Sequence, residues 1–225
     1  MHKPDHIIEI FLQPGELYFG DRATRIRTVL GSCVSLVFWH PQMLVGGMCH
    51  FMLPRRTREK NGRLDGRYAD EAIELALREI RGCNTLPSDY KVKMFGGGNM
   101  FPGIAKAEAG HVGSKNVLAA RELVRRHGFD CVSEHVEGVG HRTLFFDVWS
   151  GVVSVRHRSL APFLRNDGVG TAAHSQARCD AETSLLIPLQ FTQGSLRDSN
   201  AERTPPGGLG RLVGNRAATG SGAGK

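Results

Sequence analysis

The amino-terminal part of the chain is a series of short apolar runs separated by turn-forming residues. The runs are rich in β-branched and aromatic side chains, which is typical of strands. Steps such as Pro14-Gly15 and His40-Pro41 interrupt the runs, and such steps favour turns. The pattern predicts strands at His6–Leu12, Glu16–Phe19, Ile26–Leu30, Val34–Trp39 and Leu44–Leu53.

Two later segments carry apolar residues at helical spacing. In Tyr68–Arg81 the Ala, Ile and Leu residues recur near every third or fourth position. Asp70 and Glu71 lie early in this segment, where the helix dipole favours negative charge. Gly113–His127 has a similar pattern and ends at Gly128. Both segments are predicted to be amphipathic helices.

Further strands lie between and after the two helices. Their apolar and polar residues alternate, and Ser150-Gly151 favours a tight hairpin between the last two. These strands are predicted at Tyr90–Phe95, Asp130–Glu137, Arg142–Val148 and Val152–Arg156. Because strands outnumber helices and the helices lie mid-sequence, we expect an α+β fold, a layered α/β sandwich with a mixed, largely antiparallel sheet. This domain is expected to span residues 1–157.

The character of the sequence changes after residue 157. Gly, Ala, Ser, Arg, Asn and Thr dominate residues 158–225, and periodicity fades. Such a composition cannot bury enough apolar surface to form a core, so we expect a disordered tail. One apolar island, Leu185–Phe191, is either a chance cluster or a short docking segment for a partner.

Composition narrows the class of protein. The chain has 225 residues and a formal net charge of +7, which suggests an acidic partner. It has no dense basic block, so we do not expect nucleic-acid binding. No apolar run approaches the roughly 18 residues that a membrane span needs, and no signal peptide is evident. We therefore expect a cytoplasmic protein without membrane insertion, with its cysteines reduced.

Cys33 is the first candidate for chemistry. It follows the predicted strand Ile26–Leu30 through Gly31 and Ser32. Glycine before a reactive residue permits a tight turn and a close approach of substrate. Backbone N–H groups at such a turn lower a thiol pKa and form an oxyanion hole. The alternative is that Cys33 is a small buried hydrophobe, which is the commoner fate of a lone cysteine.

His50 is the second candidate, in the apolar segment Leu44–Leu53. A histidine there is either a core residue or a general base for a thiol. Two adjacent strands joined near His40-Pro41 would bring Cys33 and His50 side by side. Cys49 faces away from His50 on a period-2 strand, so we interpret it as structural. The other cysteines, which we do not expect to be catalytic, are Cys83, Cys131 and Cys179.

Three consecutive glycines, Gly96 to Gly98, follow the predicted strand Tyr90–Phe95. They do not fit a phosphate-binding loop, because the expected lysine and serine or threonine are missing. Room for a substrate to approach is the better interpretation. Two other turns, at residues 113–116 and 138–141, are either capped turns or walls of the site. The histidines show no metal-binding spacing, so no metal site is expected.

These segments, in this order, resemble the chemoreceptor glutamine deamidases of the CheD family. TVLGSCVSLVFWHP resembles the family's nucleophile segment, and GGMCHFMLP resembles its histidine segment. RYADEAIELALREI, KVKMFGGGNMF, VGSKNV and GHRTLFFDVWSGVVSV resemble its first helix, glycine-rich turn, second helix start and closing hairpin. The resemblance covers roughly residues 5–157, and the tail has no counterpart.

The resemblance implies a function and a set of site residues. The family converts receptor glutamines to glutamates without a cofactor, on a layered α/β sandwich. Its partners are the helices of methyl-accepting chemoreceptors and, in some bacteria, a CheC-type phosphatase. The catalytic residues implied here are Cys33, His50 and, as a third member upstream of the cysteine, Thr28. Residues expected near the substrate are Gly31, Ser32, Gly96 and Gly97.

Two other functions compete with this hypothesis. One is a non-catalytic adaptor that binds chemoreceptors or a CheC-type phosphatase. The other is nucleic-acid association through the basic tail, which steep salt dependence of binding would support. The basic segment Arg55–Arg67 is either a solvated loop or a contact for acidic receptor helices.

Overall fold

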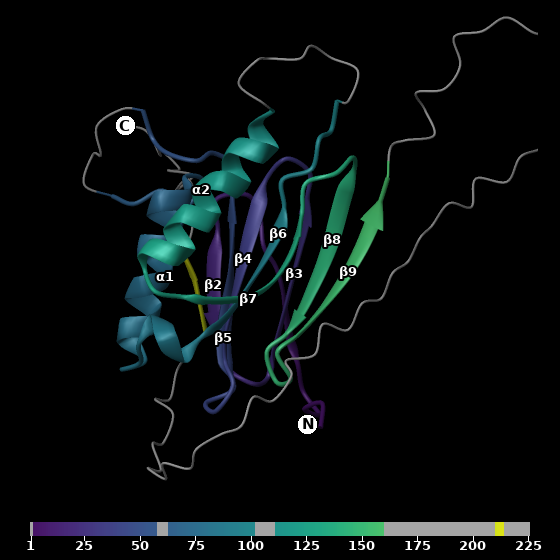
Figure 1. Cartoon of the computed structure of the whole chain (residues 1–225). Coiled ribbons are helices and arrows are strands. Elements are labelled where there is room, and N and C mark those ends of the chain that lie inside the picture. Colours follow the sequence, from purple (N-terminus) through teal and green to yellow (C-terminus); the bar gives the residue numbers. More distant parts are fainter. Residues whose placement is uncertain (1, 58–62, 102–110, 160–209, 214–225) are drawn as a thin grey trace, which may run out of the picture.

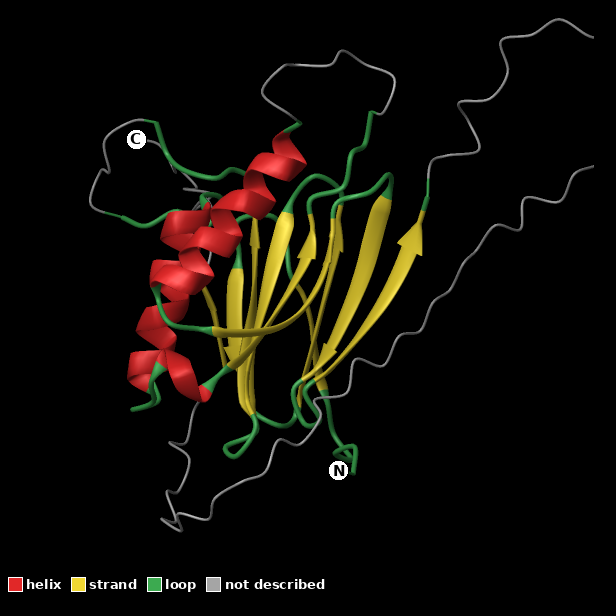
Figure 2. Cartoon of the chain, in the orientation of Figure 1, coloured by secondary structure: helices red, strands yellow, loops and turns green. Residues whose placement is uncertain are grey.

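The computed structural model describes residues 2–57, 63–101, 111–159 and 210–213. Within them the chain forms two α-helices, one short 3₁₀ helix and two sheets (Figures 1 and 2). The helices are α1 (Ala69–Gly82), α2 (Val112–Arg126) and η1 (Pro87–Asp89). The strands are β1 (Ile8–Phe11), β2 (Leu17–Gly20), β3 (Thr24–Leu30), β4 (Val34–His40), β5 (Val45–Phe51), β6 (Lys91–Gly96), β7 (Asp130–Val136), β8 (His141–Asp147), β9 (Val152–Arg158) and β10 (Gly210–Val213).

The elements form three layers. The six-stranded sheet, in the order β10-β2-β5-β4-β6-β7, lies in the middle. Helices α1 and α2 cover one of its faces, and the four-stranded sheet β1-β3-β8-β9 packs on the other (Figure 2). Pairs β1–β3 and β6–β7 are parallel, whereas the other described pairings are antiparallel. The predicted α+β layered fold is confirmed.

The burial of each strand follows its place in these layers. Every residue of β4 and β5 is buried, because both faces of the middle sheet are covered. In β3 and β8 the inward residues are buried and their neighbours are more exposed, as expected for a sheet covered on one side. The hydrophobic pattern therefore reports the layer in which a strand lies.

Two apolar clusters fill the spaces between layers. One lies between the helices and the six-stranded sheet, and it includes Ile73, Leu36 and Phe38. The other lies between the two sheets, and it includes Ile26, Leu30 and Val37. Cys33 packs against the second cluster.

The observed bounds differ from the predicted ones by a few residues at most. The first strand is Ile8–Phe11 rather than His6–Leu12, and the first helix is Ala69–Gly82 rather than Tyr68–Arg81. Strand β10 was not predicted, although it pairs with β2. The apolar island Leu185–Phe191 and Cys179 lie outside the described residues. No helix in the described ranges is long and apolar enough to cross a membrane.

Candidate active site

Cys33 lies at the point where the chain passes from one sheet to the other. Strand β3 ends at Leu30 in the four-stranded sheet, and β4 begins at Val34 in the six-stranded sheet. The turn between them contains Gly31, Ser32 and Cys33, all half-buried. A side chain at Gly31 would meet Met100, since an added Cβ lies 3.0 Å from the Met100 sulfur. The thiol thus stands where the inter-sheet space begins.

His50 lies on the neighbouring strand, on the same face of the sheet. The antiparallel register pairs His50 of β5 with Ser35 of β4, two residues beyond Cys33. Alternation along the strand places Cys33 and Ser35 on one face, so His50 is the diagonal neighbour of Cys33. The prediction of adjacent strands is confirmed. Cys49 belongs to the opposite, helix-covered face, also as predicted.

Thr28 connects His50 to the backbone across the inter-sheet space. Its hydroxyl donates to the Leu12 carbonyl at 2.8 Å, and its oxygen lies 2.9 Å from His50 Nδ1. A carbonyl only accepts, so the single hydroxyl proton of Thr28 goes to Leu12. His50 Nδ1 must then carry the proton that it donates to Thr28. This assigns the tautomer and leaves His50 Nε2 with a free lone pair.

Burial sets the protonation states of the two reactive groups. His50 is 2% exposed, and burial lowers its pKa to about 4, against a smaller opposite effect of the Leu12 carbonyl. Burial also raises the pKa of the Cys33 thiol, and its own backbone N–H acts in the opposite direction. Near neutral pH the resting pair is therefore thiol and imidazole rather than thiolate and imidazolium.

His50 Nε2 is buried and has no hydrogen-bond partner in the described part of the chain. An unpaired buried nitrogen is destabilising, and native proteins retain few of them. A neutral imidazole with a fixed tautomer and an open Nε2 is suited to accept a proton.

The glycine-rich turn packs against the backbone of Cys33. Gly97 N donates to the Cys33 carbonyl at 2.7 Å, and Gly98 N donates to the Gly31 carbonyl at 2.8 Å. Gly96 has a φ of +111°, and a Cβ there would lie 2.2 Å from the Cys33 carbonyl oxygen. These glycines are needed for close backbone contact at the nucleophile turn. Their predicted proximity to substrate stays a prediction.

The backbone N–H of Ser32 makes no hydrogen bond within the described residues, and that of Cys33 makes none to another residue and interacts with its own thiol. Unpaired N–H groups beside a nucleophile are what an oxyanion hole requires. The carbonyls of Cys33 and Gly31 are held by the glycine turn, so this part of the backbone is fixed while its donors remain available.

Two buried polar residues near the turn were not singled out from the sequence. Ser35 is fully buried, and its hydroxyl has no hydrogen-bond partner in the described ranges. Arg142 is 2% exposed; its Nε donates to His135 Nδ1 at 2.8 Å, and its Nη2 donates to the Glu137 carbonyl. A serine within an apolar run and an arginine at the start of a strand are both common in sequences. The sequence alone therefore gave no sign that these two side chains are buried.

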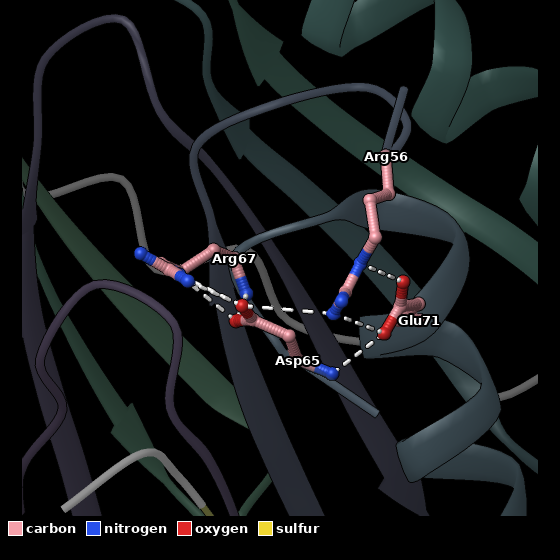
Figure 3. A network of polar contacts seen from close by, with 4 residues as sticks. All are labelled: Arg56, Asp65, Arg67 and Glu71. Atoms are coloured by element: carbon pink, nitrogen blue, oxygen red, sulfur yellow. Dashed lines mark hydrogen bonds and ion pairs between the residues drawn. The ribbon is translucent and has the colours of Figure 1, made fainter. Parts of the chain in front are cut away.

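The basic segment Arg55–Arg67 is partly engaged within the molecule (Figure 3). Arg56 binds the buried carboxylate of Glu71, with Nε 2.8 Å from Oε1. Arg67 binds Asp65 at 2.6 Å and lowers the pKa of that carboxyl. The Arg56–Glu71 pair ties the segment to the start of α1, and both arginines already hold a carboxylate within the molecule. Residues 58–62 lie outside the described ranges.

Within the described residues no three His, Cys, Asp or Glu side chains gather in a way that could hold a metal ion. The chemistry that the arrangement itself offers is nucleophilic attack by a thiol with a histidine as base.

Comparisons with known proteins agree with the residue-level picture. Residues 52–157 match the sequence model of a family described as CheD chemotactic sensory transduction. This match begins after His50, so it does not itself include Thr28, Cys33 or His50.

Several curated relatives are similar over a longer stretch. One from Pseudomonas fluorescens (strain SBW25) is 49% identical over 161 residues, covering 71% of this chain and 90% of the relative. One from Dechloromonas aromatica (strain RCB) is 47% identical, covering 67% and 88%. One from Leptospira interrogans is 39% identical, covering 68% and 95%. Each is named a probable chemoreceptor glutamine deamidase CheD. At these identities over most of each relative's length, the chain belongs to the CheD family.

Proposed function

We propose that this protein deamidates glutamine side chains of chemoreceptors, with Cys33 as nucleophile, His50 as general base and Thr28 as the residue that orients His50. The observation that carries the proposal is the hydrogen-bonded Thr28–His50 pair, which leaves Nε2 open on the face that Cys33 shares. The names of the curated relatives support the reaction and the kind of substrate.

The first half of the reaction forms a thioester. His50 Nε2 takes the proton of the Cys33 thiol as sulfur attacks the carbonyl carbon of the glutamine side chain. Negative charge on the carbonyl oxygen is stabilised by the N–H groups of Ser32 and Cys33. The imidazolium then gives its proton to the leaving nitrogen, the C–N bond breaks and ammonia departs. Thr28 holds the imidazolium through Nδ1, as the third group of a triad does.

The second half hydrolyses the thioester. Water enters where ammonia left, its oxygen attacks the carbonyl carbon of the thioester, and His50 Nε2 takes one of its protons. The C–S bond then breaks, His50 passes that proton to the sulfur of Cys33, and glutamate is released. The net change is the addition of one water and the loss of one ammonia, so no oxidant, reductant or cofactor is required.

We also propose how the rest of the chain relates to this site. Residues 1–157 form the catalytic domain, a proposal supported by the end of the family match at residue 157. Residues 158–225 form a tail outside the catalytic domain, from which β10 (Gly210–Val213) adds a strand beside β2. Chemoreceptor cytoplasmic helices are the expected substrate, which implies a cytoplasmic enzyme. A CheC-type phosphatase is a second expected partner, and its addition should change the deamidation rate if it binds near the site.

The test uses a purified chemoreceptor cytoplasmic fragment. It is incubated with the wild type, Cys33→Ala, His50→Ala and, as a matched control, Cys131→Ala, which removes another half-buried thiol far along the chain. Conversion of glutamine to glutamate is followed by peptide mass, which changes by about one dalton per event. We expect conversion by the wild type and Cys131→Ala, and at least a thousandfold slower conversion, on the order of 10³, by the other two.

Two results would contradict the proposal. Conversion that survives in Cys33→Ala would exclude Cys33 as nucleophile. Receptor binding without conversion by the wild type would favour the adaptor function instead.

A further inference from the structure

Asn116 is a fully buried polar residue on the helix that covers the nucleophile turn. It lies in the second turn of α2, and the residues that share its buried face are Val117, Ala120, Leu123 and Val124. A buried carboxamide in such a face is destabilising unless hydrogen bonds satisfy it. Its partners therefore indicate why it is there.

The side-chain amide of Asn116 bridges two backbone segments far apart in the sequence. Its Nδ2 donates to the Ser32 carbonyl at 3.1 Å and to the Met52 carbonyl at 2.7 Å. Both partners are carbonyls, which only accept, so the orientation of the amide is fixed by the contacts. Its Oδ1 is buried without a partner among the described residues.

Each of the two segments carries one member of the reacting pair. Ser32 immediately precedes Cys33. Met52 follows His50 by two residues, and it comes directly after Phe51, which pairs with Val34 at the end of the β4–β5 ladder. The Asn116 amide therefore joins the end of β5 to the turn that bears the thiol. The β4–β5 ladder ends at the Val34–Phe51 pair. Among the described residues, no ladder pairing therefore joins the turn before Val34 to the segment after Phe51.

We infer that Asn116 is a positioning residue for the reaction: its amide fixes the Cys33 turn relative to the strand that carries His50. The inference rests on the proposed function and extends it to a residue outside the cysteine, histidine and threonine. Asn116 acts through the backbone of Ser32 and Met52, and it need not touch the substrate.

Loss of the bridge should affect turnover more than substrate binding. Removing the amide frees the Ser32 carbonyl, and the half-buried turn can then move away from the end of β5. Misplacement of a reacting group by about 1 Å lowers rates by about 100-fold. We therefore expect kcat to fall about 10- to 100-fold in Asn116→Ala, with KM little changed. The thiol should also become more accessible to an alkylating reagent.

The variants are chosen to separate positioning from simple loss of stability. Asn116→Ala removes the amide, and Asn116→Asp keeps its shape but, when ionised, has no proton to donate. The matched control is Val124→Ala, which shortens a buried side chain of the same helix away from the turn. It should lower the melting temperature without changing the reaction.

The measurements are kcat and KM on the receptor fragment, the melting temperature, and the rate of Cys33 alkylation by iodoacetamide, followed on the Cys33 peptide by mass. We expect a lower kcat and faster Cys33 alkylation in both Asn116 variants, and neither change in Val124→Ala. If Asn116→Ala does not fold, Asn116→Asp decides in the same way.

Unchanged kcat and unchanged alkylation in a folded Asn116 variant would overturn the inference and leave Asn116 a structural residue. Equal changes in Val124→Ala would overturn it as well. If the wild-type protein converts no glutamine, the proposed function is refuted instead. The Cys33 alkylation rates of the Asn116 variants and of Val124→Ala would then still show whether Asn116 holds the turn.

Discussion

The two faces of the six-stranded sheet are both buried, yet they differ in what they bury. Between this sheet and the helices the buried side chains are mostly apolar, such as Ile73, Leu36 and Phe38, with Glu71 and Asn116 as buried polar exceptions on the helices. The space between the two sheets buries more polar groups, contributed by both sheets and each at most 2% exposed: Thr28, Ser35, His50, Lys93 and Arg142.

The polar groups of the inter-sheet face are not all satisfied. Ser35 Oγ, His50 Nε2 and Arg142 Nη1 are buried without a hydrogen-bond partner in the described ranges. Each such atom costs about 1 to 3 kcal/mol. Asn116 Oδ1, on α2 beside the nucleophile turn, is another. Folds accept such costs mainly at functional sites. We therefore expect the space between the sheets to carry the chemistry, and the layer under the helices, apart from Asn116, to contribute mainly to stability.

The largest expected effect concerns stability and belongs to the helix-covered face. Ile73 is fully buried on α1, and Ile73→Ala should lower the free energy of unfolding by about 2 to 5 kcal/mol because it leaves a cavity. Urea denaturation measures this change. The kcat of the folded fraction should stay near that of the wild type, and a large drop in kcat would show that the two faces are coupled.

The next effect concerns catalysis and belongs to the inter-sheet face. Thr28→Val keeps the shape but removes the hydroxyl that accepts from His50 Nδ1, so kcat should fall about 10- to 100-fold. Thr28→Ser restores the hydroxyl and should recover most of the rate. Steady-state kinetics on the receptor fragment decide the point, and full activity in Thr28→Val would remove Thr28 from the mechanism.

How far the sequence predicted this arrangement depends on the element. The strands on either side of His40-Pro41 are evident from their apolar runs, and their pairing follows from the short connection. The passage of the chain between sheets at Gly31 is not evident, because periodicity reports burial and not the sheet to which a strand belongs. The Thr28–His50 contact crosses that boundary, so only the resemblance suggested it. For Asn116 the sequence left two interpretations of residues 113–116 open, a capped turn or a wall of the site, and the contacts of its side chain with two distant backbone segments could not be predicted.

Acid should destabilise the protein partly through His50. Its folded pKa of about 4 lies below the ordinary value of 6.5, so the unfolded chain binds more protons between these pH values. The contribution of His50 is therefore present above about pH 6.5 and is lost as pH falls toward 4, by about 1 to 2 kcal/mol between pH 7 and 5. Burial also lowers the pKa of His135 and His157, which adds in the same direction.

His50→Gln isolates this contribution, because it leaves His135 and His157 in place. Urea denaturation at pH 7 and pH 5 should show a smaller loss of stability in His50→Gln than in the wild type. His6→Gln, which removes an exposed imidazole, is the matched control. An equal loss in His50→Gln and the wild type would mean that His50 is not held neutral by burial.

The smallest expected effect has the opposite sign. Ser35→Ala removes a buried hydroxyl without a partner but leaves a small cavity that offsets part of the gain, so the protein should become more stable by about 0 to 1 kcal/mol. Thermal or urea denaturation measures this. Destabilisation by more than about 1 kcal/mol would show that the hydroxyl has a partner in solution.

Trapping the covalent intermediate tests the proposed role of the inter-sheet face most directly. The wild type is mixed with the receptor fragment, quenched in acid during turnover and digested, and the Cys33 peptide is examined by mass. We expect a receptor peptide joined to Cys33 by a thioester through its glutamyl side chain, which is the glutamine side chain minus ammonia. This adduct should be cleaved by hydroxylamine and absent from Cys33→Ala. Rapid conversion of receptor glutamines with no adduct on Cys33, and undiminished conversion in Cys33→Ala, would contradict it.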